Sequence, residues 1–230
     1  WNGQWFKWEN RNTNFLYGQP DGGPTHDAPQ NGYLNRSRVS LDYIPRDNNH
    51  PYRPAIIFRM AEAYLSYAEA LNESSERMSH KQEILDNLNK IRHRAGIAEY
   101  GTGTDENGFT RIKINFSDQK EVRRLIHKER RVEFVGEGVR YHDLRRWKTA
   151  HYGIGNLNEQ GENPDWGVNG PDYGMNYYGT EYTDQGDNAF FKRTKYMDRV
   201  YPRKFYWYPI HQSEIDKDPT LVQGPFWLGE

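Results

Sequence analysis

The sequence predicts a mainly α-helical fold in which helical hairpins carry long irregular segments and only a few short strands. Two observations support this class. Helical periodicity is strong in residues 54–96 and 117–149, and it is absent from residues 1–53 and 150–200. The periodic stretches also carry helix start and stop signals, whereas Gly, Pro, Asn and Asp punctuate the others. We expect a single domain portion over residues 1–230, ending in a tail at 201–230.

The first helical hairpin is predicted over residues 54–96. Pro54 suits a first helical turn, and apolar residues then recur at steps of three and four, as on one face of an amphipathic helix. These residues are Ile57, Ala61, Tyr64, Ala68 and Leu71. Ser79 and Gln82 form a capping-box pattern for the second helix, and Gly96 stands where a left-handed C-cap belongs. The pattern is typical of a tetratricopeptide-like unit, although it exceeds the usual period of about 34 residues.

The second helical hairpin is predicted over residues 117–149. Asp118 with Glu121 is another capping-box pattern, and the Gly136–Gly138 stretch ends the helix that follows. Apolar residues that we expect on the buried side are Val122, Leu125, Ile126, Val132 and Val135, and then Tyr141, Leu144 and Trp147 in a fourth helix. Two hairpins in succession predict a small helical array. Residues 33–44 suggest one short strand, and residues 111–116 fit either a strand or an extended run.

Residues 129–147 combine four acidic groups and five arginines with large apolar residues. Glu129 and Glu133 stand one helical turn apart, but the carboxylates of glycosidases normally flank a cleft from opposite sides. With arginines in reach, both carboxylates would be ionised and paired. We therefore predict no catalytic residue here and interpret the stretch as a structural ion-pair network. Its members are Glu129, Arg130, Arg131, Glu133, Arg140, Asp143, Arg145 and Arg146. Breaking such a network is costly, so Arg145→Ala or Glu133→Ala should lower folding yield and melting temperature.

Composition argues against several classes of partner. The formal charge of −1 balances 31 basic against 32 acidic residues, so no field favours nucleic acid or an anionic membrane surface. The chain has no Cys, which excludes disulfides, thiolate metal sites and a cysteine nucleophile. His142 and Asp143 are adjacent rather than one turn apart, and the acidic residues of the loops lack calcium-loop spacing. We expect no nucleic-acid partner, no metal and no cofactor.

Four motifs resemble those of the SusD/RagB family, in the same order. Residues 59–72 (RMAEAYLSYAEALN) resemble one family helix, and residues 88–96 (LNKIRHRAG) resemble the next. Residues 129–147 match the family's "ERRvEf…EGxRxxDLrRW" stretch. The tail resembles "pIPxsEixxnPxlxQNPgw", with His211 in place of the second Pro and Gly224 in place of Asn. The resemblance is strong over residues 54–150 and 201–230 and weak in the loops.

The resemblance implies a SusD-like α-α superhelix that binds nutrients and is not an enzyme. Such proteins are lipid-anchored on the extracellular face of the outer membrane in Bacteroidetes-type bacteria. They capture glycans, or in some members peptides, for import through a TonB-dependent transporter of the SusC type. The chain would then be the C-terminal part of a longer protein whose leader and lipid-anchored Cys lie upstream.

Aromatic residues of the loops are the candidate ligand contacts. The chain holds 17 Tyr, 10 Phe and 7 Trp, and a ring face can stack on a sugar while neighbouring amides take its hydroxyls. The candidates are Trp5, Trp8, Tyr17, Trp166 and Tyr177. The alternative interpretation is that each of them anchors its loop to the core. Three functions stay open: a glycan- or peptide-binding protein, a glycan-cleaving enzyme that uses Glu129 and Glu133, and a scaffold that binds only proteins.

Overall fold

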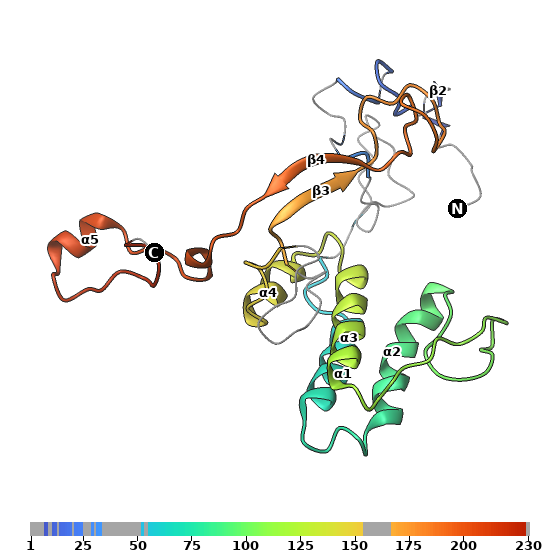
Figure 1. Cartoon of the computed structure of the whole chain (residues 1–230), viewed down its shortest axis with the longest axis horizontal. Coiled ribbons are helices and arrows are strands. Elements are labelled where there is room, and N and C mark those ends of the chain that lie inside the picture. Colours follow the sequence, from blue (N-terminus) through green and yellow to red (C-terminus); the bar gives the residue numbers. More distant parts are fainter. Residues whose placement is uncertain are drawn as a thin grey trace. The chain divides into compact units, whose positions relative to one another are not determined.

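The computed structural model describes residues 7–8, 11–12, 14–19, 21–24, 29, 31–33, 52, 55–153 and 167–228. The chain divides into two compact units, which are described separately. The helical unit comprises Ser37–Thr149 and Gly155–Trp166, and the loop unit comprises Trp1–Arg36, Ala150–Ile154 and Gly167–Glu230. Most regular structure is helical and the strands are short, so the predicted fold class is confirmed (Figure 1).

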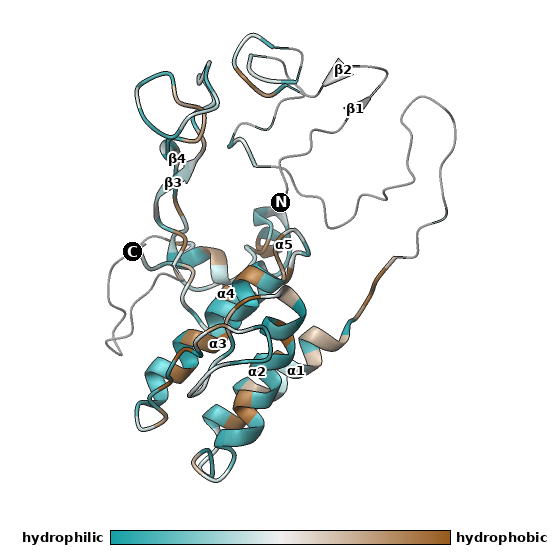
Figure 2. Ribbon diagram, turned by 90° about the vertical axis from the view of Figure 1, so that its right-hand side faces the viewer, coloured by the Kyte–Doolittle hydropathy of each residue, from teal (hydrophilic) through white to brown (hydrophobic). Residues whose placement is uncertain are grey.

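The helical unit is built from four helices: α1 (Met60–Glu73), α2 (Lys81–Ala95), α3 (Gln119–Glu133) and α4 (Val139–Arg146). Helix α1 packs against both α2 and α3. Apolar positions along these three helices alternate with hydrophilic ones, as Figure 2 shows, because each helix buries one stripe and exposes the rest. The buried stripes meet in one core, whose members are Ala61, Leu65, Ala68, Leu71, Ile84, Leu88, Ile91, Tyr100, Val122, Leu125, Ile126 and Phe134.

Two of the predicted helix ends are confirmed and two are wrong. Gly96 is the left-handed C-cap of α2 (φ 66°), and the Asp118 side chain accepts hydrogen bonds from the first turn of α3. In helix α2, however, the N-cap position is His80, whose side chain makes no capping hydrogen bond, and the Ser79 hydroxyl donates instead to the Glu76 carbonyl. Helix α1 begins at Met60 rather than near Pro54.

The late start of α1 has a visible cause. Arg59 is extended (φ −140°, ψ 154°), and its guanidinium donates to the carboxylates of Glu133 and Glu137. An extended residue cannot continue a helix towards the N-terminus. Ile57, which was predicted to lie on the buried face, is therefore 96% exposed.

The predicted buried side of α3 and α4 is correct only in part. Val122, Leu125 and Ile126 are buried, but Val132 and Val135 are exposed. The reason is that α3 ends at Glu133, so Phe134 takes the core position and is 2% exposed. On α4, Leu144 is buried, Trp147 at the C-cap is half-buried and Tyr141 is exposed.

The connector between α2 and α3 contains isolated bridges rather than a strand. Tyr100 pairs with Ile112, and Thr104 pairs with Thr110. Residues 111–116 are thus an extended run, the second of the two predicted possibilities. Of the strand suggested at residues 33–44, all but the first residue lies outside the described residues.

The loop unit contains two small antiparallel pairs: β1 (Lys7–Trp8) with β2 (Arg11–Asn12), and β3 (Gly170–Gly174) with β4 (Thr194–Arg199). The second pair lies in a segment that was predicted to be loop. Its pairing is irregular between Asp172 and Tyr173, and most of its side chains stay at least partly exposed. A pair held by its main-chain ladder with no buried face leaves no alternating apolar pattern in the sequence.

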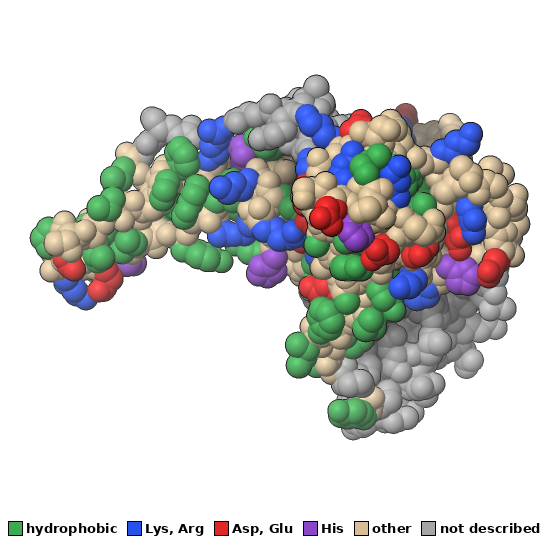
Figure 3. Space-filling model, turned by 90° about the horizontal axis from the view of Figure 1, so that it is seen from below, with side chains coloured by type: hydrophobic (Ala, Val, Ile, Leu, Met, Phe, Trp, Pro, Cys, Tyr) green, Lys and Arg blue, Asp and Glu red, His purple; other side chains and the backbone are tan. Residues whose placement is uncertain are grey.

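The C-terminal segment follows β4 and holds the 3₁₀ helix η1 (Arg203–Tyr206) and α5 (Gln212–Lys217), neither of which has a buried residue. Large apolar side chains are exposed along it, on the left in Figure 3; they are Phe205, Trp207, Tyr208, Val222, Phe226 and Leu228. Its rings contact one another, with Trp207 beside Phe226 and Phe205 beside Trp227. The segment is therefore ordered by local aromatic contacts.

Candidate functional site

Two of the five predicted ligand aromatics meet in the loop unit. The ring centroids of Tyr17 and Tyr177 lie 6.5 Å apart with their planes at 72°. Trp5 and Trp166 lie outside the described residues, and Trp8 belongs to β1, with its side chain likewise outside the described part of the chain. The structure thus brings Tyr17 and Tyr177 together although they are 160 positions apart in the sequence.

Backbone and hydroxyl contacts hold these two loops against each other. The Tyr17 amide donates to the Gly179 carbonyl at 2.8 Å. The Tyr182 hydroxyl accepts from the Phe15 amide at 2.8 Å and donates to the Asn14 side chain at 2.9 Å. Because these bonds are local to one small region, Tyr17 has a fixed position relative to residues 177–182.

Tyr177 supports this region from inside. Its ring lies against Gly23, where an added Cβ would stand 2.6 Å from the ring. The space beside it, lined by Phe15 and Phe190 among others, is only about 10 Å³. That is about the room one water needs, so Tyr177 cannot line a ligand pocket there. Tyr177 is half-buried and anchors the loop, as the alternative interpretation of the aromatics proposes.

Tyr178 is the exposed partner that the sequence did not single out. It is 68% exposed, and its ring centroid lies 5.4 Å from those of both Tyr17 and Tyr177. Tyr17 is 37% exposed. The available signal was the Tyr177-Tyr178 pair itself; the two residues share a turn closed by the Gly179 amide and the Asn176 carbonyl, and their ring planes stand at 89° to each other. One ring can then anchor the loop while the next faces solvent. We call Tyr17, Tyr177 and Tyr178 the tyrosine cluster.

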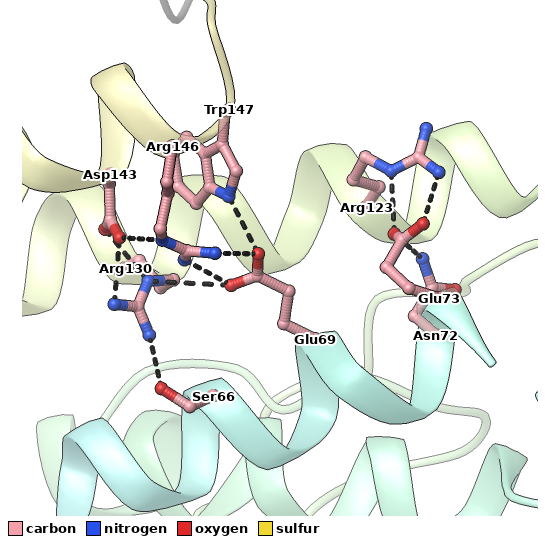
Figure 4. Close-up of polar contacts among 9 residues, drawn as sticks. All are labelled: Ser66, Glu69, Asn72, Glu73, Arg123, Arg130, Asp143, Arg146 and Trp147. Carbon is pink, nitrogen blue, oxygen red and sulfur yellow. Dashed lines mark hydrogen bonds and ion pairs between the residues drawn. The ribbon is translucent and has the colours of Figure 1, made fainter.

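The charge-rich stretch of residues 129–147 lies in the helical unit, where its side chains reach across helices (Figure 4). Arg130 on α3 donates two hydrogen bonds to Asp143 on α4, at 2.9 and 3.0 Å, and a third to Ser66 on α1. Arg130 and Asp143 are each 3% exposed. One buried guanidinium therefore joins three helices.

Glu69 on α1 is a second centre of this network, although sequence reasoning did not include it. It accepts two hydrogen bonds from Arg146, at 2.5 and 2.6 Å, and one from the Trp147 indole at 2.7 Å. Burial opposes ionisation of Glu69, but the bonds from Arg146 and Trp147 outweigh it and lower the pKa of the carboxyl. The signal was available, because Glu69 lies within the quoted motif of residues 59–72.

Glu129 and Glu133 point to different partners outside their own stretch. Glu129 accepts from Arg92 at 2.5 Å and from the Tyr100 hydroxyl at 2.8 Å. Burial is the main cause of the raised pKa of the Tyr100 hydroxyl, and the negative charge of Glu129 raises this pKa further. Glu133 accepts from Arg59 and Arg94. Each carboxylate is therefore engaged by at least one arginine.

The other predicted members of the network are more peripheral. Arg145 donates a hydrogen bond to the Tyr141 hydroxyl at 2.8 Å. Arg131 is exposed, whereas Arg140 is half-buried. The positive charge of Arg140 contributes to lowering the pKa of His127. A cleft of about 480 Å³ opens along the network between α1 and α4, but Glu69 and Asp143 in its lining already bind arginines. Among the described residues, no three His, Asp or Glu side chains gather as metal ligands would. None of the described helices is long and apolar enough to span a membrane.

Comparison with known proteins gives one consistent result. The family model described as "SusD family" matches residues 3–227, nearly the whole chain. The chain belongs to the SusD family. Two SusD-like proteins of Formosa agariphila, P25 and P38, are each 32% identical to it, over 109 and 103 residues, which is 47% and 45% of this chain. A crystal structure of a SusD-like protein from Bacteroides fragilis has a TM-score of 0.50 and 27% identity over 75% of this chain.

The chain spans about a fifth of the length of these curated SusD-like relatives and about a quarter of the Bacteroides fragilis protein. Within this SusD-family chain the two candidate regions differ in chemistry. In the ion-pair network, the polar groups form hydrogen bonds with other protein groups. In the tyrosine cluster, the rings of Tyr17 and Tyr178 are exposed to solvent. The tyrosine cluster therefore keeps exposed side chains that are not used in ion pairs.

Proposed function

We propose that this SusD-family chain binds nutrient glycans at the bacterial cell surface for import through a TonB-dependent transporter of the SusC type. The glycan contacts the exposed faces of Tyr17 and Tyr178. Family membership supports nutrient binding in a SusC/SusD system in general terms. The ligand class, the transporter partner and attachment to the outer membrane through an N-terminal lipid anchor belong to the proposal.

The tyrosine cluster is the observation that carries the proposal. Tyr17 and Tyr178 are both exposed, with their ring centroids 5.4 Å apart, and Tyr177 packs against Gly23 in the same region. A tyrosine ring combines a flat apolar face with a hydroxyl, which suits the apolar face and hydroxyl rim of a sugar. Because the loops are already tied together by hydrogen bonds, little conformational entropy is lost on binding.

We further propose that the chain binds glycan without cleaving it. Glycosidases place one carboxyl as an acid and a second on the opposite side of the scissile bond. Glu129 instead accepts hydrogen bonds from Arg92 and Tyr100. Glu133 accepts hydrogen bonds from Arg59 and Arg94. Both carboxylates are also largely buried, with Glu129 5% exposed and the Glu133 side chain 8% exposed.

A glycan array should identify a ligand, and titration calorimetry on that ligand should then compare variants. Tyr178→Ala should weaken affinity about tenfold, or roughly 1.4 kcal/mol, which is a common cost of truncating an aromatic contact residue. Tyr17→Ala should have a similar but smaller effect, since less of its ring is exposed. Tyr196→Ala on β4 is the matched control, because Tyr196 is 38% exposed and lies outside the cluster.

Three results would contradict the proposal. Equal affinity of the Tyr178→Ala and wild-type proteins would remove the cluster from the binding site. Release of reducing ends that stops in Glu129→Gln would favour the glycan-cleaving enzyme. Binding of peptides but of no glycan would favour the peptide-binding alternative, and co-purification with a transporter without any glycan affinity would favour a protein-binding scaffold.

A further inference from the structure

A second open cleft lies in the helical unit, apart from both the tyrosine cluster and the ion-pair network. It has a volume of about 730 Å³ and runs between one face of α2 and the connector of residues 99–116. Ligand clefts in proteins commonly measure roughly 300–1,000 Å³. The cleft is therefore large enough for a ligand of several residues or rings.

The floor and one wall of the cleft are fixed in place. Leu85, Ile114 and Phe116 line it and also pack against the hydrophobic core. Asn89 on α2 holds the opposite wall, because its amide donates to the Tyr100 carbonyl at 2.9 Å and accepts from the Tyr100 amide at 2.8 Å. The cleft is thus a preformed feature of the fold.

Two backbone units at the edge of the cleft are unpaired. Ile112 is paired on both sides, since its amide donates to Glu99 and its carbonyl accepts from Gly101. In Lys113 and Ile114, by contrast, neither the N–H nor the C=O makes a hydrogen bond to any described residue. Successive side chains of an extended run leave on opposite faces, yet Lys113 and Ile114 both line the cleft. The backbone between them must therefore border it.

We propose that this cleft binds an internal extended segment of another polypeptide, which adds a strand along Lys113–Ile114. An unpaired extended edge recognises the repeating amides of a peptide, and an adjoining pocket selects one side chain. Here the apolar floor of Leu85, Ile114 and Phe116 takes one apolar side chain of the segment. The two aromatic residues that line the cleft are used by the fold, because Tyr100 is 3% exposed and Phe116 is half-buried against the hydrophobic core.

The charges at the rim explain why the segment is internal rather than a free peptide. Asp86 and Lys90 stand on the α2 side, and Glu106 and Lys113 stand on the opposite side. Glu99 and Arg111 also line the connector side and are paired with each other at 2.8 Å. Each wall therefore carries equal numbers of carboxylates and of Lys or Arg side chains, so the cleft has no polarity that would orient a free ammonium and a free carboxylate. In a bound segment, charged side chains that flank the apolar residue can pair with rim residues of opposite charge in either orientation of the segment along the cleft.

The test uses two blocked pentapeptides, acetyl-Thr-Lys-Leu-Glu-Thr-amide and its charge-reversed form acetyl-Thr-Glu-Leu-Lys-Thr-amide. Titration into the ¹⁵N-labelled full chain, followed by NMR, gives both the affinity and the location of the site. We expect shifts in residues 82–93 and 99–116 for at least one peptide. The same peptide with an N-methylated leucine should bind at least tenfold more weakly, because it lacks an amide donor.

On the protein side, Lys113→Pro should weaken binding at least tenfold, because it removes a backbone N–H that the fold does not use. Lys113→Ala is the matched control; it removes the same charge but keeps the N–H, and it should stay within threefold of wild type. If Lys113→Pro fails to fold, the N-methylated peptide decides the question on the wild-type chain.

Four outcomes would overturn the proposal. They are no binding of either peptide at millimolar concentration, equal binding of the N-methylated peptide, shifts confined to the loop unit, and binding more than tenfold tighter when the peptide ends are free. None of them bears on glycan binding at Tyr17 and Tyr178, so this inference and the proposed function fail separately.

Discussion

The helical unit and the loop unit use the same kinds of residue in opposite ways. In the helical unit, charged side chains such as Arg130 and Asp143 are buried and bound to each other across helices. In the loop unit, Tyr17 and Tyr178 are held by their loops and remain exposed. The charged residues, which are the obvious candidates for chemistry in the sequence, thus stabilise the fold. The uncharged Tyr17 and Tyr178 are the residues that remain accessible to solvent.

This contrast follows from the cost of burial. A buried charge is tolerated only when it is paired and hydrogen-bonded, so a dense charge cluster between helices has no groups left for a ligand. An exposed aromatic ring on a fixed loop contributes little to the stability of the fold and is available to contact a ligand. Substitutions in the first region should therefore change stability without changing affinity, and substitutions in the tyrosine cluster should do the reverse.

The largest expected effect is that of Arg130→Ala. Removing this guanidinium takes away one of the two arginines, Arg130 and Arg146, that donate to the buried Asp143 carboxylate, and it breaks the link to Ser66. Breaking a buried pair from one side costs about 3–5 kcal/mol. Urea denaturation should show this loss in the free energy of unfolding, while glycan affinity measured on the folded fraction stays unchanged.

Arg145→Ala is the matched control for that experiment. Arg145 also lies in the 129–147 stretch, but it donates to the exposed Tyr141 hydroxyl and should cost less than about 1 kcal/mol. The structure thus ranks Arg130 above Arg145, which the sequence alone predicted to be important. Equal losses in the two variants would mean that burial does not distinguish these arginines, and the contrast between the two units would lose its physical basis.

The next effect in size concerns His127, whose ring stacks on Trp147 with the centroids 3.4 Å apart. Burial, and then the charges of Arg146 and Arg123, lower the pKa of His127 to about 3. In the unfolded chain its pKa is about 6.5. Between pH 6.5 and pH 3, His127 is protonated in the unfolded chain but stays neutral in the folded chain. The free energy of unfolding therefore decreases as the pH is lowered from about 6.5 to about 3. Between pH 7 and pH 5 the loss is about 2 kcal/mol.

His127→Phe should remove this pH dependence while keeping a ring beside Trp147. The measurement is the free energy of unfolding in urea at pH 7 and pH 5, for wild type and variant. Glu69 does not account for this loss: burial raises the pKa of its carboxyl, but the hydrogen bonds from Arg146 and Trp147 outweigh that effect and lower the pKa below its ordinary value. If both proteins lose the same stability between pH 7 and pH 5, His127 is not the group responsible.

How much of this could be read from the sequence depends on whether a feature is local. Helix periodicity gave the core positions Ala61, Ala68 and Leu71, because a helix repeats its own face. Pairing across helices was less accessible: residues 129–147 showed which groups must be paired, but not that Glu69, Arg92 or Arg59 would supply the partners. Those contacts join positions up to 78 apart.

The site was harder to predict than the fold for the same reason. Tyr17 and Tyr177 come together through contacts between loops that have no period, such as the Tyr17 amide with the Gly179 carbonyl. Which ring is exposed depends on Gly23, since only a residue without a Cβ leaves room for the Tyr177 ring. No pattern in either loop shows this close approach, so the sequence indicated the residue type but not that Tyr178, rather than Tyr177, is the exposed ring.

The smallest effect compares two helix starts that look alike in the sequence. Asp118 and Ser79 both begin a capping-box pattern, but only the Asp118 side chain accepts hydrogen bonds from the first-turn amides, at 2.9 Å from Lys120 and 3.2 Å from Glu121. Losing such a cap costs about 1 kcal/mol. Asp118→Ala should therefore lower the free energy of unfolding by about that amount.

Ser79→Ala should cost less than about 0.5 kcal/mol, because its hydroxyl only donates to the nearby Glu76 carbonyl in an exposed turn. Thermal and urea denaturation of both variants, with circular dichroism at 222 nm, would measure the difference. A loss from Ser79→Ala as large as that from Asp118→Ala would mean that the Ser79 side chain caps α2, as the sequence pattern predicts. Glycan affinity should be unchanged in both variants, since both positions belong to the helical unit and the tyrosine cluster belongs to the loop unit.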